Sequence, residues 1–156
     1  PRQVYRNLGN GRFEELTQTI GGPLIEKKSS RGAAFADYDN DGDMDVLVVN
    51  MSEPPQLLRN DTESDHHWIV LKLAGAKSNR DGIGARVTFA PRQTAEVRSG
   101  GSYLSHNDFR IHFGLGKSAK AGPVEVRWPS GLVETFSELE ADRYHTLEEG
   151  NGAAKK

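Results

Sequence analysis

Short runs in which apolar and polar residues alternate cover most of the chain, and this pattern is typical of β-strands. In the first part of the chain the runs predict strands at five places: residues 4–8, 12–17, 32–37, 45–50 and 56–60. Asn10-Gly11 separates the first two runs and predicts a hairpin turn, because both residues tolerate positive φ. Helix signals are weak throughout, so we expect an all-β fold.

The second half shows the same short apolar and polar runs, at fairly even spacing. They predict seven strands: residues 68–73, 85–90, 93–99, 109–115, 123–128, 132–136 and 144–149. Val124, Val126 and Trp128 share one face of a strand and have charged residues between them. Seven short strands with turn residues between them predict an antiparallel β-sandwich. Trp68 and Trp128 both lie within apolar strand faces, so we expect both in the core.

A polar stretch, Asp61–His67, divides the two halves. We predict three parts, a single propeller-like β-blade, a sandwich and a disordered tail: residues 1–62, 63–150 and 151–156. A short internal sequence similarity supports the blade. Val4–Asn7 and Leu57–Asn60 share the pattern apolar, apolar, Arg, Asn and start 53 positions apart. Propeller blades repeat at roughly 40–50 residues. A chance match over four residues is the alternative.

Charge and composition argue against two classes of partner. The 156 residues carry a net charge of -2, with a pI of about 6.2, so we expect no nucleic-acid partner and no binding to anionic lipid. No apolar run approaches the roughly 20 residues that span a bilayer, so we expect no membrane insertion. The chain has no cysteine, which removes disulfides, thiolate metal sites and a cysteine nucleophile.

The stretch DYDNDGDMDV, residues 37–46, carries aspartate at alternate positions with one glycine among them. Calcium takes roughly six to eight oxygen ligands, which a tight loop supplies from alternate residues, and Gly42 permits the sharp turn. The pattern predicts a strand–loop–strand calcium site with five candidate ligands: Asp37, Asp39, Asp41, Asp43 and Asp45. An EF-hand would need a glutamate where this chain has Val48. The alternative is an acidic turn without an ion, in which the carboxylates repel one another uncompensated.

Two other segments carry candidate binding residues. The loop SNRDGIG places Asn79, Arg80 and Asp81 together, either to recognise a ligand or to bond the backbone of their own turn. Tyr103, in the glycine-rich SGGSYLS, is the aromatic residue best placed to contact a ligand.

The polar residues elsewhere do not predict catalysis. Ser105, His106 and Asp108 are nearly adjacent, and neighbouring residues on one strand point apart, so they do not predict a catalytic triad. His66 and His67 follow the same rule, and we expect them to be solvated linker residues. The sequence therefore predicts a protein that is not an enzyme.

Both halves resemble known families. GAAFADYDNDGDMDVLVVN, with NLGNGRFEELT before it, resembles the FG-GAP or VCBS-type repeat of calcium-binding β-propellers. The second half, from HHWIVLKLAG through SNRDGIGARV, GGSYLSHNDFRIHFGLG and VEVRWPSG to HTLEEG, resembles the ASPIC/UnbV domain of the cartilage acidic protein and UnbV-like family. The resemblance implies calcium at the five aspartates and a secreted or cell-surface parent protein with several blades. It implies no reaction.

We therefore expect a calcium-binding, non-catalytic interaction or scaffolding segment of a larger protein, with Ca²⁺ as its cofactor. The partner class stays open between protein and glycan, and the exposed blade is a candidate surface for self-association. Two alternatives remain. A carbohydrate-binding module needs two or three exposed aromatic residues on one face, and of Trp68, Trp128 and Tyr103 only Tyr103 is free to serve. An accessory protein of secondary-metabolite biosynthesis needs a pocket with convergent polar groups.

Overall fold

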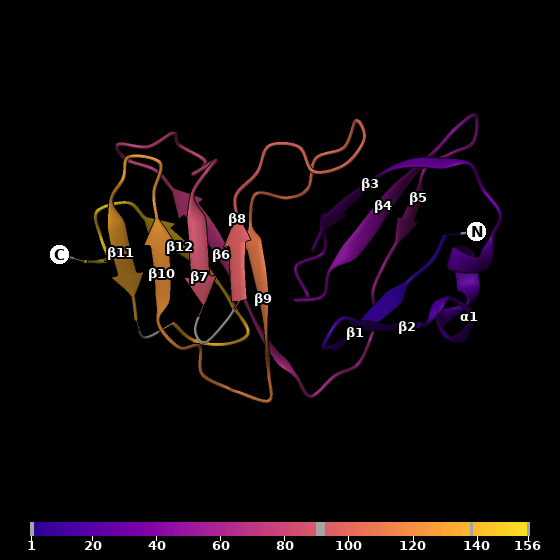
Figure 1. Cartoon of the computed structure of the whole chain (residues 1–156), viewed down its shortest axis with the longest axis horizontal. Coiled ribbons are helices and arrows are strands. Elements are labelled where there is room, and N and C mark those ends of the chain that lie inside the picture. Colours follow the sequence, from indigo (N-terminus) through magenta and orange to yellow (C-terminus); the bar gives the residue numbers. More distant parts are fainter. Residues whose placement is uncertain (1, 90–92, 138, 156) are drawn as a thin grey trace.

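The computed structural model describes residues 2–89, 93–137 and 139–155. Its strands form two units that lie side by side, an N-terminal and a C-terminal unit (Figure 1). Within the described residues the N-terminal unit has five strands and two short helical turns: β1 (Tyr5–Gly9), β2 (Arg12–Glu15), α1 (Thr17–Ile20), η1 (Gly22–Ile25), β3 (Ser30–Ala36), β4 (Asp45–Asn50) and β5 (Gln56–Leu58). The C-terminal unit has eight strands there: β6 (His67–Ala74), β7 (Arg86–Phe89), β8 (Gln93–Glu96), β9 (Ile111–Gly116), β10 (Val124–Arg127), β11 (Val133–Phe136), β12 (Arg143–Glu148) and β13 (Ala153–Ala154). The all-β prediction is confirmed.

Each predicted strand of the N-terminal unit is present. At the first turn Asn10 and Gly11 have φ values of 52° and 72°, as the predicted hairpin requires. β1 and β2 pair across this turn, and β3, β4 and β5 form a separate antiparallel sheet in that order. The β3–β4 pairing ends with Ala36 opposite Asp45. The aspartate-rich segment is therefore the connection between these two strands.

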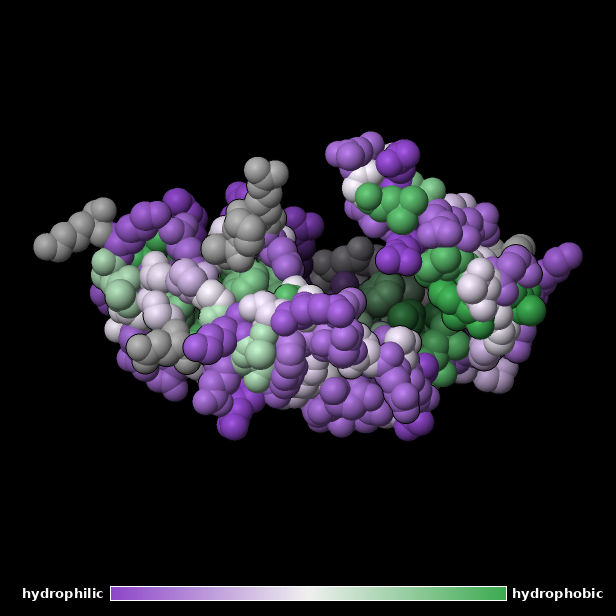
Figure 2. Space-filling view, turned by 90° about the horizontal axis from the view of Figure 1, so that it is seen from below, coloured by the Kyte–Doolittle hydropathy of each residue, from purple (hydrophilic) through white to green (hydrophobic). Residues whose placement is uncertain are grey.

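The sheet β3-β4-β5 has apolar side chains on both faces. Phe35, Val46 and Leu58 are register neighbours on one face and line a hollow of about 300 Å³. The opposite face, called the open face below, carries three exposed residues: Leu47, Val49 and Leu57. Figure 2 shows the hydrophobic side chains of this unit as green patches at the molecular surface. A sheet with two apolar faces is suited to lie between two other layers, as a propeller blade does.

The C-terminal unit is a sandwich of two sheets. The strand order is β13-β11-β10-β7-β8 in one sheet and β12-β6-β9 in the other. Their inner faces meet in a core that includes Ile69, Val87, Val126 and Trp128, none of which is more than 2% exposed. All seven strands that the sequence predicted for this unit are present.

Two details of this unit differ from the prediction. β12 pairs with β6 in parallel, because the chain changes sheets between β11 and β12 and enters beside β6 in the same direction. The expected disorder of residues 151–156 is wrong for Ala153–Ala154, which pair with β11. The cause is buried Glu134, whose carboxylate accepts hydrogen bonds from the amides of Gly150 (3.0 Å) and Gly152 (3.1 Å). These bonds hold the end of the chain beside β11.

A second buried carboxylate, Glu149, closes one end of the sandwich. It accepts hydrogen bonds of 2.7–2.8 Å from the amides of Ala76, Lys77 and Ser78, and one of 2.5 Å from Ser130 Oγ. Burial acts to raise the pKa of Glu149, but the bonds from Ser130 and from the amides of Ser78 and Ala76 outweigh it and lower the pKa to about 2. The ionised carboxylate therefore ties the loop after β6 to the end of β12.

Candidate metal centre

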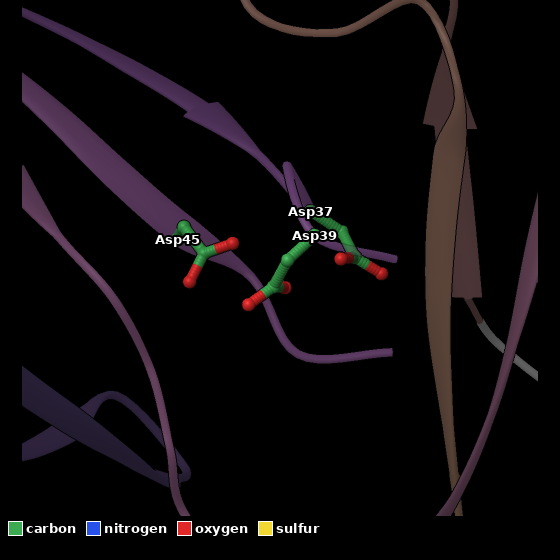
Figure 3. A group of neighbouring side chains, drawn as sticks. All are labelled: Asp37, Asp39 and Asp45. Carbon is green, nitrogen blue, oxygen red and sulfur yellow. The ribbon is translucent and has the colours of Figure 1, made fainter. Parts of the chain in front are cut away.

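The aspartate loop, residues 37–45, spans the closed end of the β3–β4 hairpin. Asn40 (φ 61°) and Gly42 (φ 99°) turn the chain within it, the latter in a region that only glycine adopts freely. Three of the five predicted ligands come together, each with an oxygen within 4.8 Å of the others (Figure 3): Asp37, Asp39 and Asp45. Asp41 and Asp43 lie outside this group.

Asp37 folds the loop around its own carboxylate. Its two oxygens accept hydrogen bonds from the amides of Asp41 (3.1 Å) and Gly42 (2.9 Å). The residue is 3% exposed, so the bonds also compensate the cost of burying a charged group. Asp37 is thus fixed before any ion is considered.

Asp45 is fixed at the other end of the loop. Its carboxylate accepts hydrogen bonds from the amide of Tyr38 (3.1 Å) and from the amide of Asn60 (2.8 Å), which follows β5. The residue is 2% exposed. Asp39 lies between these two buried carboxylates and is exposed, so it is the ligand most free to move.

The negative charge of the loop is largely uncompensated. Desolvation, followed by the charges of Asp41 and Asp45, raises the pKa of Asp39. Desolvation and the charge of Asp41 likewise raise the pKa of Asp43. Among the described residues, Arg59 is the cation within ion-pair distance of a loop carboxylate, at 3.9 Å from Asp39. Arg59 makes a shorter ion pair, of 2.7 Å, with Asp61 outside the loop. A bound cation would relieve this repulsion.

The chemistry of the donor set fits calcium. The clustered ligands are all carboxylates. Hard oxygen donors suit calcium, whereas zinc and copper favour imidazole or thiolate ligands. Magnesium demands near-octahedral geometry and usually binds through one or two carboxylates and several waters, so a cluster of three carboxylates suits calcium better.

The loop packs on the outer face of the sheet β12-β6-β9. Val70 of β6 lies opposite Tyr144 of β12 and opposite His112 of β9, and Trp68 shares the same face. Val70 is 2% exposed although it lies outside the core of the sandwich, so this outer face is covered. We call four residues of this surface the clasp: Trp68, Arg110, His112 and Tyr144.

Four hydrogen bonds join the clasp to the loop, and one of them runs from Arg110 Nη1 to the side-chain oxygen of Asn40 (2.7 Å). Arg110 Nη2 donates to the carbonyl oxygen of Asp37 (2.8 Å), and His112 Nε2 donates to the carbonyl oxygen of Gly42 (2.7 Å). The Tyr144 hydroxyl donates to the carboxylate of Asp37. Burial and this bond raise the pKa of Tyr144, so the hydroxyl remains a donor at neutral pH. These contacts join residues about 70 to 107 positions apart in the chain, so no local pattern in the sequence predicts them.

Trp68 belongs to this contact, so its predicted place in the core is wrong, whereas that of Trp128 is confirmed. The Trp68 ring stacks on His112 (centroids 6.3 Å apart, 18° between planes) and meets Tyr144 edge-on (5.3 Å, 68°). The indole also lies against Gly42, where an added Cβ would be 2.1 Å from the ring. Strand alternation places Trp68 on the outer face, and the sequence does not show that this face is covered.

A second contact between the units runs along β3, an edge strand. The amide of Asp108 donates to the carbonyl oxygen of Phe35 (3.1 Å), and the amide of Phe35 donates to Asn107 Oδ1 (3.1 Å). Further along β3, Gly32 lies so close to Ser105 that an added Cβ would be 2.3 Å from its Oγ. The two units therefore meet through backbone as well as side chains.

The other candidate binding residues lie apart from the aspartate loop. The side-chain amide of Asn79 donates to and accepts from the backbone of Ile83 (2.7 and 2.8 Å), as in a self-bonded turn. Arg80 and Asp81 are exposed beside it. Tyr103 is 65% exposed in the loop before β9. A role of these residues in ligand binding stays a prediction.

Two expectations about polar residues can be compared with the structure. Ser105, His106 and Asp108 each have a different partner, so the described hydrogen bonds do not join them into a triad. His67 is not a solvated linker residue: it begins β6, and its Nδ1 lies 2.6 Å from a carboxylate oxygen of Asp142. The prediction failed because the strand starts before the apolar run does.

Comparisons with known proteins assign both units to families. The family model described as "ASPIC and UnbV" matches residues 75–154, and the model described as "FG-GAP-like repeat" matches residues 2–48. The first match covers more than half of the chain. The chain therefore belongs to the ASPIC and UnbV family, with an FG-GAP-like repeat before that domain. Neither match fixes the predicted boundary at residue 62, which stays a prediction.

The chain is also similar to curated relatives. It is 29% identical over 154 residues to cartilage acidic protein 1 of Homo sapiens and 27% identical over 154 residues to that of Mus musculus. Each alignment covers 94% of this chain but 23% of the relative, so the chain spans about a quarter of the length of these proteins. No solved structure gives a significant match. The matched families include no catalytic one.

Because the loop packs on the clasp, Gly42→Ala should lower the free energy of unfolding by more than a glycine substitution at an open position. A matched control is Gly100→Ala, because both glycines have positive φ (99° and 89°) and both substitutions strain the backbone by about 1–2 kcal/mol. No atom lies within 4 Å of a Cβ at Gly100, whereas at Gly42 the Cβ overlaps the Trp68 ring. We expect this overlap to cost about 1–3 kcal/mol more in the free energy of unfolding, measured with urea. Equal losses in the two variants would contradict the packing.

Proposed function

We propose that the chain is a calcium-binding, non-catalytic interaction segment of a larger secreted or cell-surface protein. The observation that carries the proposal is the cluster of Asp37, Asp39 and Asp45 at the end of a β-hairpin in an FG-GAP-like repeat. Two of these carboxylates are buried and already oriented by backbone amides. Such a set is suited to bind a hard cation with little rearrangement.

Asp37, Asp39 and Asp45 would hold the ion, and Asp41 and Asp43 would strengthen the negative field around it. When bound, calcium supplies the positive charge that the loop lacks. Its role is structural, because it ties the end of β3 to the start of β4. Extracellular modules bind calcium with dissociation constants of about 10⁻⁴–10⁻³ M, and a site with one exposed, movable ligand suits that range.

A secreted or cell-surface setting is supported by the similarity to a protein whose name refers to cartilage. In the described ranges, the helical turns lack the length and apolar character that a bilayer crossing requires. The absence of catalysis is supported by the separate partners of Ser105, His106 and Asp108. A role in interaction or scaffolding follows best from these features.

The two alternatives have less support. For carbohydrate binding, Trp128 is buried and Trp68 is engaged in the contact between the units, so neither can join Tyr103 in an exposed aromatic platform. For a role in secondary metabolism, the hollow beside β3 is lined by more apolar than polar side chains, and two of the polar ones, Arg2 and Ser30, are bonded to each other (3.1 Å).

Calcium should stabilise the chain in a way that depends on Asp39. A ligand that binds only the folded state adds about 2.7 kcal/mol to the free energy of unfolding at a free concentration of 100 times Kd. We expect the Tm to rise in millimolar calcium and to fall in chelator, and this difference to vanish in Asp39→Asn. Asp39 is the cleanest site, because its side chain does not hold the backbone of other loop residues as those of Asp37 and Asp45 do. The control is Asp81→Asn, an exposed aspartate in another loop. Wild-type curves that coincide in calcium and chelator would refute the calcium site.

We also propose that the open face is an interaction surface. Leu47, Val49 and Leu57 are 41%, 47% and 51% exposed on the same side of the sheet. Contiguous exposed apolar residues mark docking surfaces. Because the curated relatives are about four times longer and a blade normally packs between others, a neighbouring repeat is the occupant that fits best. In the isolated chain, a second copy is expected to take that place.

Charges on the open face should therefore suppress self-association. The double variant Leu47→Lys/Leu57→Lys should sediment as a monomer at concentrations at which the wild type forms larger species. Ile20→Lys, an equally exposed apolar residue in α1 (53%), is the control and should behave like the wild type. Sedimentation velocity over a hundredfold concentration range measures this. A wild type that stays monomeric throughout, or a double variant that associates equally, would rule out this surface.

A further inference from the structure

Both units bind the same loop residue, Asp37. Its own loop supplies two amides to the carboxylate, from Asp41 and Gly42. The C-terminal unit supplies the Tyr144 hydroxyl to the carboxylate and Arg110 Nη2 to the backbone carbonyl. The direction in which Asp37 points therefore depends on the position of the C-terminal unit.

Tyr144 is itself held from two sides. Its ring meets Trp68 edge-on at 5.3 Å, and the guanidinium of Arg110 lies over it, 5.2 Å from the ring centroid. An aromatic ring fixed by two neighbours holds its hydroxyl in place. The hydroxyl thus works as a rigid donor to Asp37.

Arg110 and His112 hold the loop without occupying the clustered carboxylates. Arg110 Nη1 donates to the side-chain oxygen of Asn40 (2.7 Å), and His112 Nε2 donates to the carbonyl oxygen of Gly42 (2.7 Å). Neither is within ion-pair distance of Asp39 or Asp45 in the described residues. The positive charge of Arg110 therefore supports the loop while those two carboxylates stay free for a cation.

We propose that the clasp is an outer shell of the metal site, so that calcium binding and the docking of the two units are one coupled equilibrium. This inference rests on the proposed calcium binding. Tyr144 is a positioning residue, which acts on the ion through Asp37. Coupling is reciprocal: if docking raises the affinity for calcium by some factor, calcium strengthens docking by the same factor. Groups that orient metal ligands typically change metal affinity by about 10–100-fold.

Isothermal titration of calcium into the full chain tests the coupling. Tyr144→Phe removes one hydroxyl and keeps the ring, and Tyr103→Phe makes the same change at an exposed tyrosine. We expect Tyr144→Phe to bind calcium about tenfold more weakly and Tyr103→Phe to match the wild type. Thermal unfolding separates positioning from simple destabilisation. A positioning role shrinks the calcium-dependent rise in Tm, whereas a purely structural loss lowers the Tm equally with and without calcium.

Trp68 reports docking directly. The chain has two tryptophans, and Trp128 is buried in the core with its Nε1 bonded to Glu134 (2.8 Å). Calcium should therefore change the fluorescence of the wild type, and the change should be lost in Trp68→Phe. Arg110→Ala, which removes the bonds to Asp37 and Asn40, is the second variant if Tyr144→Phe does not fold.

The outcomes distinguish the two proposals. A wild type that does not bind calcium overturns both the calcium site and the coupling. A wild type that binds calcium with the same affinity as Tyr144→Phe and Arg110→Ala, without a fluorescence response from Trp68, overturns the coupling and leaves the calcium site in place. Weaker binding in both variants together with a Trp68 response supports the coupling.

Discussion

Repulsion among the carboxylates of the aspartate loop is the constraint on which the rest of the structure depends. Asp37 and Asp45 are almost completely buried at the closed end of a hairpin, with Asp39 between them. Backbone amides offset part of the cost of burying these charges, and a cation would offset the remainder. A loop under this strain needs support from outside, and the outer face of the sandwich provides it.

Because the sandwich supports the loop, the contact between the two family segments is part of the structure of the candidate metal site. The FG-GAP-like match ends at residue 48 and the ASPIC and UnbV match begins at residue 75, so Trp68 lies between them. The aspartate loop belongs to the first match, whereas Arg110, His112 and Tyr144 belong to the second. The candidate metal site in one family segment is thus packed against side chains of the other, which explains how a single blade is held beside a small sandwich.

The elements that depend on local pattern were predictable from the sequence. Alternation located the strands, Asn10-Gly11 located a hairpin, and aspartate spacing located the loop. The clasp was not predictable, because the run from Trp68 to Leu71 is apolar on both faces of its strand and so does not separate Trp68 from the core. Nor does alternation show that another unit covers the outer face. Glu134 was missed for a similar reason: a glutamate in a strand is usually solvated, and one of its partners, Gly152, belongs to the tail that was predicted to be disordered. Aromatic residues at outward strand positions were the available signal for a covered face.

Hydrogen–deuterium exchange of the full chain, with calcium and with chelator, tests most directly whether an ion at the loop joins the two units. Exchange protection reports local opening, so a shared site should protect both sides of the contact. We expect calcium to slow exchange in residues 37–45 and also in β6, β9 and β12, while β10 and β11 in the far sheet change little. Protection confined to residues 37–45, or no change in any segment, would contradict the view that the aspartate loop and the clasp form one metal-dependent structure.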